Sequence, residues 1–423
     1  MPNPSSIQIS TLSKYIREGK YIFLNTVLER LSFFIVFVLL ARIVTKDLYG
    51  IIVTAFAFAN ILHSFFEFGF PFYIQRETAT GNANLNNEIS SIVKFRSYCF
   101  LLFVLIIGLY FYKEASISIF AFYIIALSVY ISGFNTIFNS FLLGNRAYKE
   151  SFSVLFKARI ILLLTFLLFF YFALSPVILL IPFLLSSLVY LYLIIKVSMK
   201  NGFKFHNHSL DINDLKKIFK SSIPIGIGVI FVWLYDRIDI LMVQRMIDLS
   251  SVASYAVAYS LYKIPQIISG AILIPTYTDY SRRFSRTHYL KFDDIIKLGV
   301  LLLIISILFI IIFLYSSDSL IMILYGTKYK TSTQYLKILA FAIPGIYFNN
   351  LTGVISNSIR KEKIPLLSTG IGVLICITMN AILIPVIGIW SAVYTTIAVE
   401  YVVFLVQLAF LLKYYFNKKI NFI

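Results

Sequence analysis

Long apolar stretches alternate with short polar segments along the whole chain. Each apolar stretch contains about 20 residues, the length of α-helix that spans the hydrocarbon core of a bilayer. The pattern predicts an all-α polytopic membrane protein with about twelve spanning helices. The predicted spans lie near residues 21–43, 48–74, 92–112, 117–142, 150–173, 176–198, 218–243, 252–277, 294–316, 333–357, 364–386 and 389–412.

Lysine and arginine are distributed unequally among the connections between these spans. Every second connection is rich in basic residues, including Arg76, Lys94 and Arg96 after the second span, whereas the intervening connections hold few. Basic loops remain on the cytoplasmic side of a membrane. We therefore expect both termini and the 199–217 connection to be cytoplasmic. The first 20 residues show no small-residue cleavage site, which favours a retained segment over a signal peptide.

The longest cytoplasmic connection, residues 199–217, lies at the middle of the chain, with six predicted spans on each side. Two such halves are typical of transporters with internal repeats, whose substrate path lies where the repeats meet. Weak similarity between the segments around Arg42 and Arg245 supports a duplication. The predicted parts are a cytoplasmic N-terminal segment (1–20), an N-terminal six-helix half (21–198), a cytoplasmic linker (199–217), a C-terminal six-helix half (218–412) and a cytoplasmic tail (413–423).

Composition supports a membrane protein without a water-soluble domain. The 423 residues are 59% hydrophobic and 13% charged, with a mean hydropathy of +0.87. Soluble domains contain about 25% charged residues. Basic cytoplasmic loops explain the net charge of +18, so no nucleic-acid partner is expected. Cys99 and Cys376 lie in apolar stretches and indicate no disulfide.

Ionisable residues inside predicted spans are candidate functional residues, because a charge at the bilayer centre costs several kcal/mol. Asp236 and Asp239 are three residues apart and share a helix face. The basic candidates for a substrate-binding cavity are Arg30, Arg237, Lys157, Arg159 and Lys263. The acidic candidates for ion pairing or coupling to an ion gradient are Glu29, Asp236, Asp239 and Glu67.

Two interpretations of these charges remain open. In the structural one, acidic and basic side chains pair between helices and hold the halves together. In the functional one, they line a polar cavity where cations attract an anionic substrate and carboxylates carry protons or a coupling ion. Lys157 and Arg159 could instead extend to the inner interface, and Glu67 could cap local structure. Glu400 has no preferred role.

Motifs of other chemistries are missing from the sequence. There is no glycine-rich phosphate loop ending in Lys-Ser or Lys-Thr, so ATP does not drive this chain directly. His206 and His208 are the only close histidine pair, and no cysteine lies near them. We expect neither a bound metal nor a cofactor.

Several segments carry a family resemblance. They are residues 41–50 after the first span, 67–70 and 75–77 at the end of the second, 235–239 in the seventh and 380–389 at the end of the eleventh. Together they resemble the polysaccharide-transporter branch of the MATE-like flippase superfamily, and within it the Wzx-type O-antigen flippases. The resemblance implies a MATE-like fold. It also implies transfer of an undecaprenyl-diphosphate-linked oligosaccharide from the cytoplasmic to the periplasmic leaflet of a bacterial inner membrane.

The same resemblance implies alternating access coupled to a cation gradient, and protein partners in polysaccharide assembly such as a polymerase or a chain-length regulator. The chemistry fits, because a diphosphate is anionic and arginine binds phosphate through paired hydrogen bonds. By span position, the family's cationic cavity corresponds to Arg30, Lys157, Arg159, Arg237 and Lys263.

Other functions compete with this interpretation. A MATE-like multidrug or solute antiporter would carry cations and favour carboxylates in its cavity, whereas the mixed charges here lean towards an anion without deciding the matter. An O-antigen polymerase or a lipid-dependent glycosyltransferase would carry a large outer loop or paired acids in an early outer loop. The outer loops are short, and the first contains only Asp47 as an acid. We therefore expect a transporter and not an enzyme.

Overall fold

Helices make up the described part of the chain. The computed structural model describes residues 4–113, 119–172, 174–205, 212–287, 289–290 and 292–418. No strand occurs within these ranges, and the predicted all-α fold is confirmed. The middle of the 199–217 connection, including His206 and His208, lies outside the described residues, as do 1–3 and 419–423.

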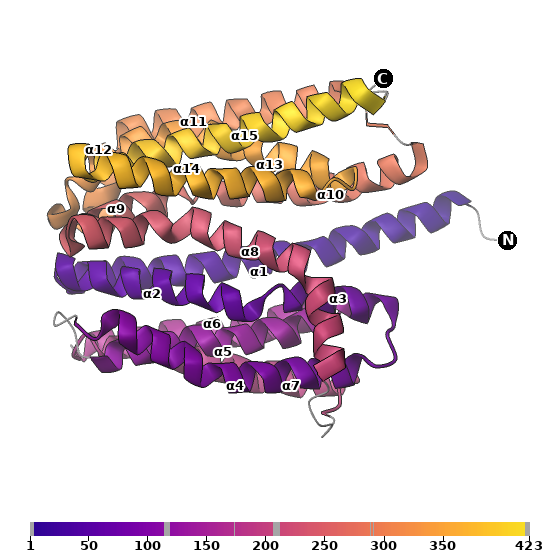
Figure 1. The fold of residues 1–423 in the computed structure, drawn as a ribbon, viewed down its shortest axis with the longest axis horizontal. Helices are drawn as coiled ribbons and strands as arrows, with labels where there is room; N and C mark the ends of the chain where they lie inside the picture. The colour runs from indigo at the N-terminus through magenta and orange to yellow at the C-terminus, as the bar shows by residue number, and fades with distance from the viewer. Residues whose placement is uncertain are drawn as a thin grey trace. The chain divides into compact units, whose positions relative to one another are not determined.

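Ten helices of the described residues are long and apolar enough to cross a membrane, or up to twelve if each of two bent pairs is one span. The prediction of about twelve spans agrees with the larger number. Figure 1 shows the helices, which are α1 (Pro4–Ile43), α2 (Lys46–Glu67), α3 (Phe70–Thr80), α4 (Leu85–Phe111), α5 (Ile119–Gly144), α6 (Tyr148–Tyr171), α7 (Ile181–Lys200), α8 (Ile212–Met246), α9 (Leu249–Tyr262), α10 (Gln266–Thr287), α11 (Phe292–Tyr325), α12 (Ser332–Leu339), α13 (Ile343–Ser358), α14 (Lys363–Ile387) and α15 (Trp390–Lys418). Short 3₁₀ turns are η1 (Ile178–Leu180), η2 (Thr327–Tyr329) and η3 (Ala340–Ala342).

The chain forms two compact units. The first comprises Met1–Leu40 and Phe58–Ile230, and the second comprises Ala41–Ala57 and Phe231–Ile423. In the first unit, α5 packs against α3, α4 and α7, and α6 packs on α7. In the second unit, α15 packs against α13 and α14, and α13 packs against α10 and α11. The predicted division into six-helix halves rests on topology and stays a prediction.

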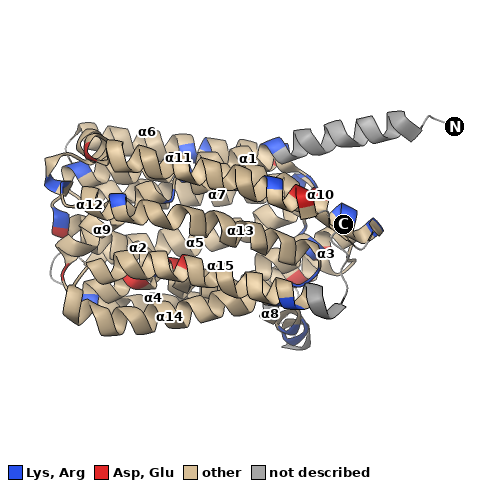
Figure 2. Ribbon diagram, turned by 90° about the horizontal axis from the view of Figure 1, so that it is seen from above, with Lys and Arg blue, Asp and Glu red and all other residues tan. Residues whose placement is uncertain are grey.

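Large apolar side chains are exposed along one side of several long helices. On α4, Leu101, Leu105 and Leu109 follow one another at one-turn intervals and are 75%, 58% and 62% exposed. Such a surface is stable in hydrocarbon, where an α-helix satisfies its backbone hydrogen bonds internally. Charged residues lie mainly towards the helix ends in Figure 2, with few along the middle. The protein is a multi-pass membrane protein.

The predicted second span, 48–74, is wrong at its end. Helix α2 ends at Glu67, and α3 begins at Phe70. Between them Phe68 and Gly69 have φ angles of 47° and 74°. These left-handed conformations end the right-handed helix, and for a residue with a side chain they are strained.

The assignment of Lys94 and Arg96 to an inner connection is also wrong. Both lie within α4, which begins at Leu85 and not near residue 92. The helix continues through this polar segment because Glu88 and Ser91 are buried within the first unit, where Tyr73 of α3 donates a 3.0 Å hydrogen bond to Glu88. Arg96 is therefore a residue of a candidate span.

Candidate functional site

Five charged side chains of the second unit form a group that we call the α8–α15 cluster. Successive residues of α8 are rotated by about 100°, so Asp236 and Asp239 share a face and Arg237 points away from it. Lys263 follows the C-terminus of α9, where the helix dipole favours a cation. Glu400 lies in α15 and is 2% exposed. The cluster brings together four of the candidate residues and Glu400.

Lys263 lies between two carboxylates. Its Nζ is 2.8 Å from Asp236 Oδ1 and 3.9 Å from Glu400 Oε1. The ammonium also lies 5.0 and 5.5 Å from the ring centres of Tyr259 and Tyr262, in cation–π geometry. Tyr259 in turn donates a 2.7 Å hydrogen bond to Asp236 Oδ1. Lys263 is therefore the counter-charge that connects α8 with α15.

Hydroxyl and amide groups hold the two most buried carboxylates of the α8–α15 cluster. Asp239 is 4% exposed and accepts a hydrogen bond from the hydroxyl of Tyr255, which lies 2.9 Å from Thr396 Oγ1. Glu400 Oε2 accepts a 3.3 Å hydrogen bond from Asn349 Nδ2. Donors of this kind stabilise an ionised carboxylate and fix its orientation.

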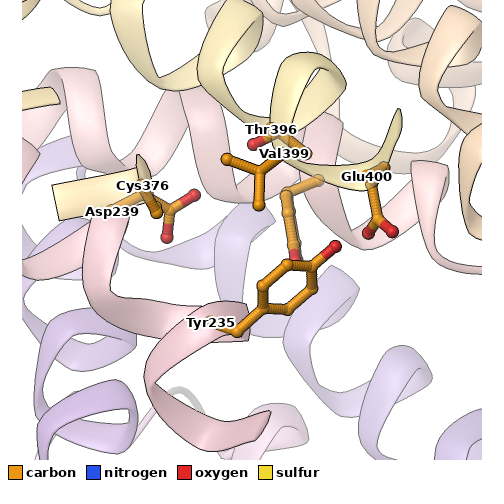
Figure 3. A pocket seen from close by; sticks show the side chains of 7 residues that line it. Tyr235, Asp239, Cys376, Thr396, Val399 and Glu400 are labelled. Carbon is orange, nitrogen blue, oxygen red and sulfur yellow. The ribbon is translucent and has the colours of Figure 1, made fainter. Parts of the chain in front are cut away.

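A small cavity separates Asp239 from Glu400. Its volume is about 10 Å³, which is room for about one water-sized occupant. In Figure 3 the two carboxylates lie at opposite sides of the cavity. The lining residues come from α8, α9, α14 and α15 and are Tyr235, Asp239, Tyr259, Cys376, Thr396, Val399 and Glu400.

The α8–α15 cluster contains one more carboxylate than base. Lys263 and Arg237, whose Nε is 3.2 Å from Asp236 Oδ2, are its bases. Three carboxylates and two bases leave a formal charge of −1 when all are ionised. A net charge inside a membrane is unfavourable, so the cluster is suited to take up one proton or one small monovalent cation. Among the described residues, no group of three or more His, Cys, Asp or Glu side chains could hold a metal ion.

In the first unit, Glu29 of α1 pairs with Arg159 of α6. Arg159 Nη2 is 3.0 Å from Glu29 Oε1, and the guanidinium lies 4.5 Å from the ring centre of Phe33. Arg159 is 7% exposed, whereas the Glu29 side chain is 54% exposed. The pair joins two helices whose charged residues are 130 positions apart in the chain.

The remaining candidates are not part of these two groups. Arg30 of α1 and Lys157 of α6 are exposed. Glu67, the last residue of α2, has its Oε1 2.7 Å from Thr136 Oγ1 of α5. The role of Arg30 and Lys157 as substrate-binding cations stays a prediction.

A third group, the α2–α4–α5 cluster, was not predicted from the sequence. Arg96 is fully buried; its Nη1 donates to the Gly133 carbonyl over 3.2 Å, and its Nη2 is 2.8 Å from His63 Nε2. The guanidinium also lies 5.3 and 5.1 Å from the ring centres of Tyr130 and Phe134. The position of His63 within an apolar run is the signal that could have identified it, since an ionisable group in a span is a candidate site.

Comparison with protein families gives two matches. The family described as "Polysaccharide biosynthesis protein" matches residues 16–281, which is more than half of the chain. The MatE family matches residues 224–382. A comparison with curated protein sequences gives no match.

The fold is similar to those of solved membrane transporters. The lipid II flippase MurJ in an inward closed conformation aligns with a TM-score of 0.75 and 17% identity, over 94% of this chain and 87% of that one. An inward-facing multidrug resistance MATE family transporter of the MOP superfamily aligns with a TM-score of 0.72 and 12% identity, over 94% and 99% of the two chains. For a MOP superfamily transporter from Pyrococcus furiosus the TM-score is 0.65 at 11% identity, over 93% and 94%. These similarities confirm the MATE-like fold.

Proposed function

Because this chain belongs to the polysaccharide biosynthesis protein family, we propose that it is a flippase that moves a lipid-linked oligosaccharide between the leaflets of a membrane. The family match over residues 16–281 carries the proposal. The similarity in fold to a lipid II flippase supports it. In its specific form, the substrate is an undecaprenyl-diphosphate-linked O-antigen or polysaccharide repeat unit. It moves from the cytoplasmic to the periplasmic leaflet of the inner membrane by alternating access.

The distribution of cations is consistent with an anionic headgroup. Arg30 and Lys157 are exposed, and the Arg237 side chain is 36% exposed, so these three are the residues we assign to binding the diphosphate. Arginine suits this role because it binds phosphate through paired hydrogen bonds and keeps its charge when desolvated. Arg159 is only 7% exposed, and the Lys263 side chain is 19% exposed and lies between two carboxylates. We assign them to fixing the helices that carry the other cations.

We assign the coupling step to the α8–α15 cluster. Its one-charge excess and its cavity of about 10 Å³ fit the uptake of a single small cation. A proton fits a cavity of this size because it needs only one of the lining carboxylates as its acceptor. Asp239 and Glu400 are the carboxylates that line the cavity, and we expect one of them to carry the proton.

The proposed cellular setting follows from the same function. The loop charges favour an inner-membrane orientation with cytoplasmic termini. A flippase supplies its substrate to enzymes on the far side of the membrane, so we expect it to work with a polymerase or a chain-length regulator. The chain itself would act without catalysis.

Reconstitution into liposomes tests the proposed function. A fluorescent undecaprenyl-diphosphate oligosaccharide is placed in both leaflets, and a membrane-impermeant reagent reports the fraction accessible from outside. We expect the wild-type protein to equilibrate the leaflets and Arg237→Ala to do so at least about tenfold more slowly, the loss of about 1.4 kcal/mol of transition-state stabilisation. Arg245→Ala, on the same helix, is the matched control. Equal rates with empty and protein-containing liposomes would contradict the proposal.

A multidrug antiporter is the second candidate function, because the MatE family matches residues 224–382. The same liposomes distinguish the two functions. Uptake of a lipophilic cation such as ethidium, driven by a proton gradient and without glycolipid transfer, would favour the antiporter. Glycolipid transfer without ethidium uptake would favour the flippase.

A further inference from the structure

The contact between Arg96 and His63 defines the protonation state of the histidine. An arginine guanidinium is always protonated and can only donate hydrogen bonds. Arg96 Nη2 lies 2.8 Å from His63 Nε2, so Nε2 must be the acceptor. A histidine that accepts at Nε2 carries its single proton on Nδ1 and is neutral. The fold as described therefore requires a neutral His63.

Protonation of His63 would break this contact. A second proton on the imidazole places an N–H donor and a positive charge opposite the donors and the positive charge of Arg96. The other ionisable groups that act on Arg96 are Glu67, Tyr130 and Cys99. The Tyr130 ring faces His63 at 6.3 Å between ring centres. Glu67 is the one carboxylate among these groups, and it is one turn from His63 on the same helix.

Gly133 shows that the space for this pair is built into the fold. A Cβ atom at Gly133 would lie 2.0 Å from His63 Nε2 and 2.1 Å from Arg96 Nη2. Only glycine leaves room for both side chains, and its carbonyl accepts a hydrogen bond from Arg96. The three residues thus connect α2, α4 and α5.

This connection lies next to a strained break in the backbone. His63 is one turn before Glu67, where α2 ends, and Phe68 follows with a left-handed φ of 47°. A non-glycine residue in that conformation persists only when its surroundings hold it. Gly226 of α8 contributes to this, because a Cβ there would lie 2.7 Å from the Phe68 carbonyl oxygen.

We propose that His63 and Arg96 form a proton-sensitive latch that holds the end of α2, and that protonation of His63 releases the α2–α3 junction. The latch is separate from the α8–α15 cluster, which lies in the other compact unit. It gives the first unit its own response to acidity, whatever the transported substrate.

Hydrogen–deuterium exchange of the purified protein in nanodiscs tests the latch. Exchange in peptides covering residues 60–72 is measured from about pH 8 to about pH 4 and is corrected for the intrinsic exchange rate at each pH. This range extends below the pH at which an unperturbed histidine titrates. In the wild type we expect exchange to rise as the pH falls and His63 becomes protonated. The rise should be up to about tenfold for each pH unit of decrease, as release by one proton requires. Peptides from α14 serve as the internal control.

His63→Gln is the decisive variant. The glutamine amide oxygen can accept from Arg96 but does not titrate, so we expect slow exchange at every pH. Gly133→Ala, which fills the space of the pair, should show fast exchange at every pH in the same peptides. If His63→Gln does not fold, ¹⁵N NMR of the wild-type imidazole tests the latch instead. We expect Nε2 to be unprotonated at the pH values where exchange is slow and protonated where exchange is fast. A wild type without pH-dependent exchange, or a His63→Gln variant with the same dependence, would overturn the latch. None of these measurements uses a lipid-linked substrate.

Discussion

Lys263 shows how one basic residue can lie near carboxylates on two helices. It is close to Asp236 and Glu400, which belong to different helices; Asp236 is also paired with Arg237, whereas Glu400 has Lys263 as its nearby base in the cluster. The sequence placed Lys263, Asp236 and Asp239 among the candidates because each interrupts an apolar stretch. It could not pair Lys263 with Glu400, because that contact joins residues more than 130 positions apart and depends on the packing of α9 against its neighbours.

Removal of Lys263 should destabilise the second unit. Lys263→Met leaves the buried Glu400 without its nearby cation and Asp236 with Arg237 alone, which is expected to cost about 3–5 kcal/mol, as for other broken buried pairs. The added change Glu400→Gln removes the stranded charge and should recover part of the loss. Thermal unfolding of the detergent-solubilised protein measures both effects.

Lys157→Met is the matched control for this experiment. Lys157 is exposed on α6, and its replacement should change stability by no more than about 0.5 kcal/mol. Equal losses for Lys157→Met and Lys263→Met would show that Lys263 is not the counter-charge of the cluster.

Among the elements, α8 is a long helix with a sharp bend. It runs as Leu215–Ile223 and Ile225–Met246 with a bend of 56°, and the bend falls at Pro224, which has no amide hydrogen for the helix ladder. Directly after the bend, Gly226 approaches the backbone of Phe68 and Gly69. Apolar periodicity predicted a helix here, but the close approach was not predicted, because a glycine in an apolar stretch is equally compatible with many packing partners.

Gly226→Ala should separate α8 from the α2–α3 junction. The new Cβ would lie 2.7 Å from the Phe68 carbonyl oxygen, and a backbone atom cannot move away as a flexible side chain can. We expect a destabilisation of about 1–3 kcal/mol, which is typical of overpacking, measured by thermal unfolding. Gly270→Ala is the matched control, because nothing lies within 4 Å of its Cβ position. It should be neutral or stabilise α10 by about 0.5–1 kcal/mol. A loss of stability in the control as large as that of Gly226→Ala would refute the packing argument.

At the scale of the whole molecule, the fold class and the number of spans were predictable because lipid imposes one rule on every spanning segment. Each segment must be long, apolar and helical, and that rule is visible in the sequence. Local exceptions were not predictable. Arg96 lies about three turns inside α4, in its polar N-terminal half, where a loop and a buried helical segment have similar composition. The break at Phe68 depends on a backbone conformation that few non-glycine residues adopt.

The orientation of the molecule in the membrane is still a prediction from loop charges, and reporter fusions test it. Alkaline phosphatase fused within 199–217 should be inactive, because that enzyme folds only outside the cytoplasm, whereas a fusion after Lys113 should be active. A fluorescent protein that fluoresces only when it folds in the cytoplasm should give the opposite pattern: fluorescence when fused within 199–217 and none when fused after Lys113. Phosphatase activity within 199–217 would invert the topology and the direction of transfer.

The extra carboxylate of the α8–α15 cluster has an electrical consequence. Under the coupling proposed above, one proton bound per cycle carries one elementary charge across the membrane. At 100 mV that charge is worth about 2.3 kcal/mol, which corresponds to about a fifty-fold concentration difference between the leaflets. An anionic cargo leaving and a proton entering both move net positive charge inward. A voltage that is negative inside would therefore favour both the exit of the anionic cargo and the entry of the proton, and transfer should be electrogenic.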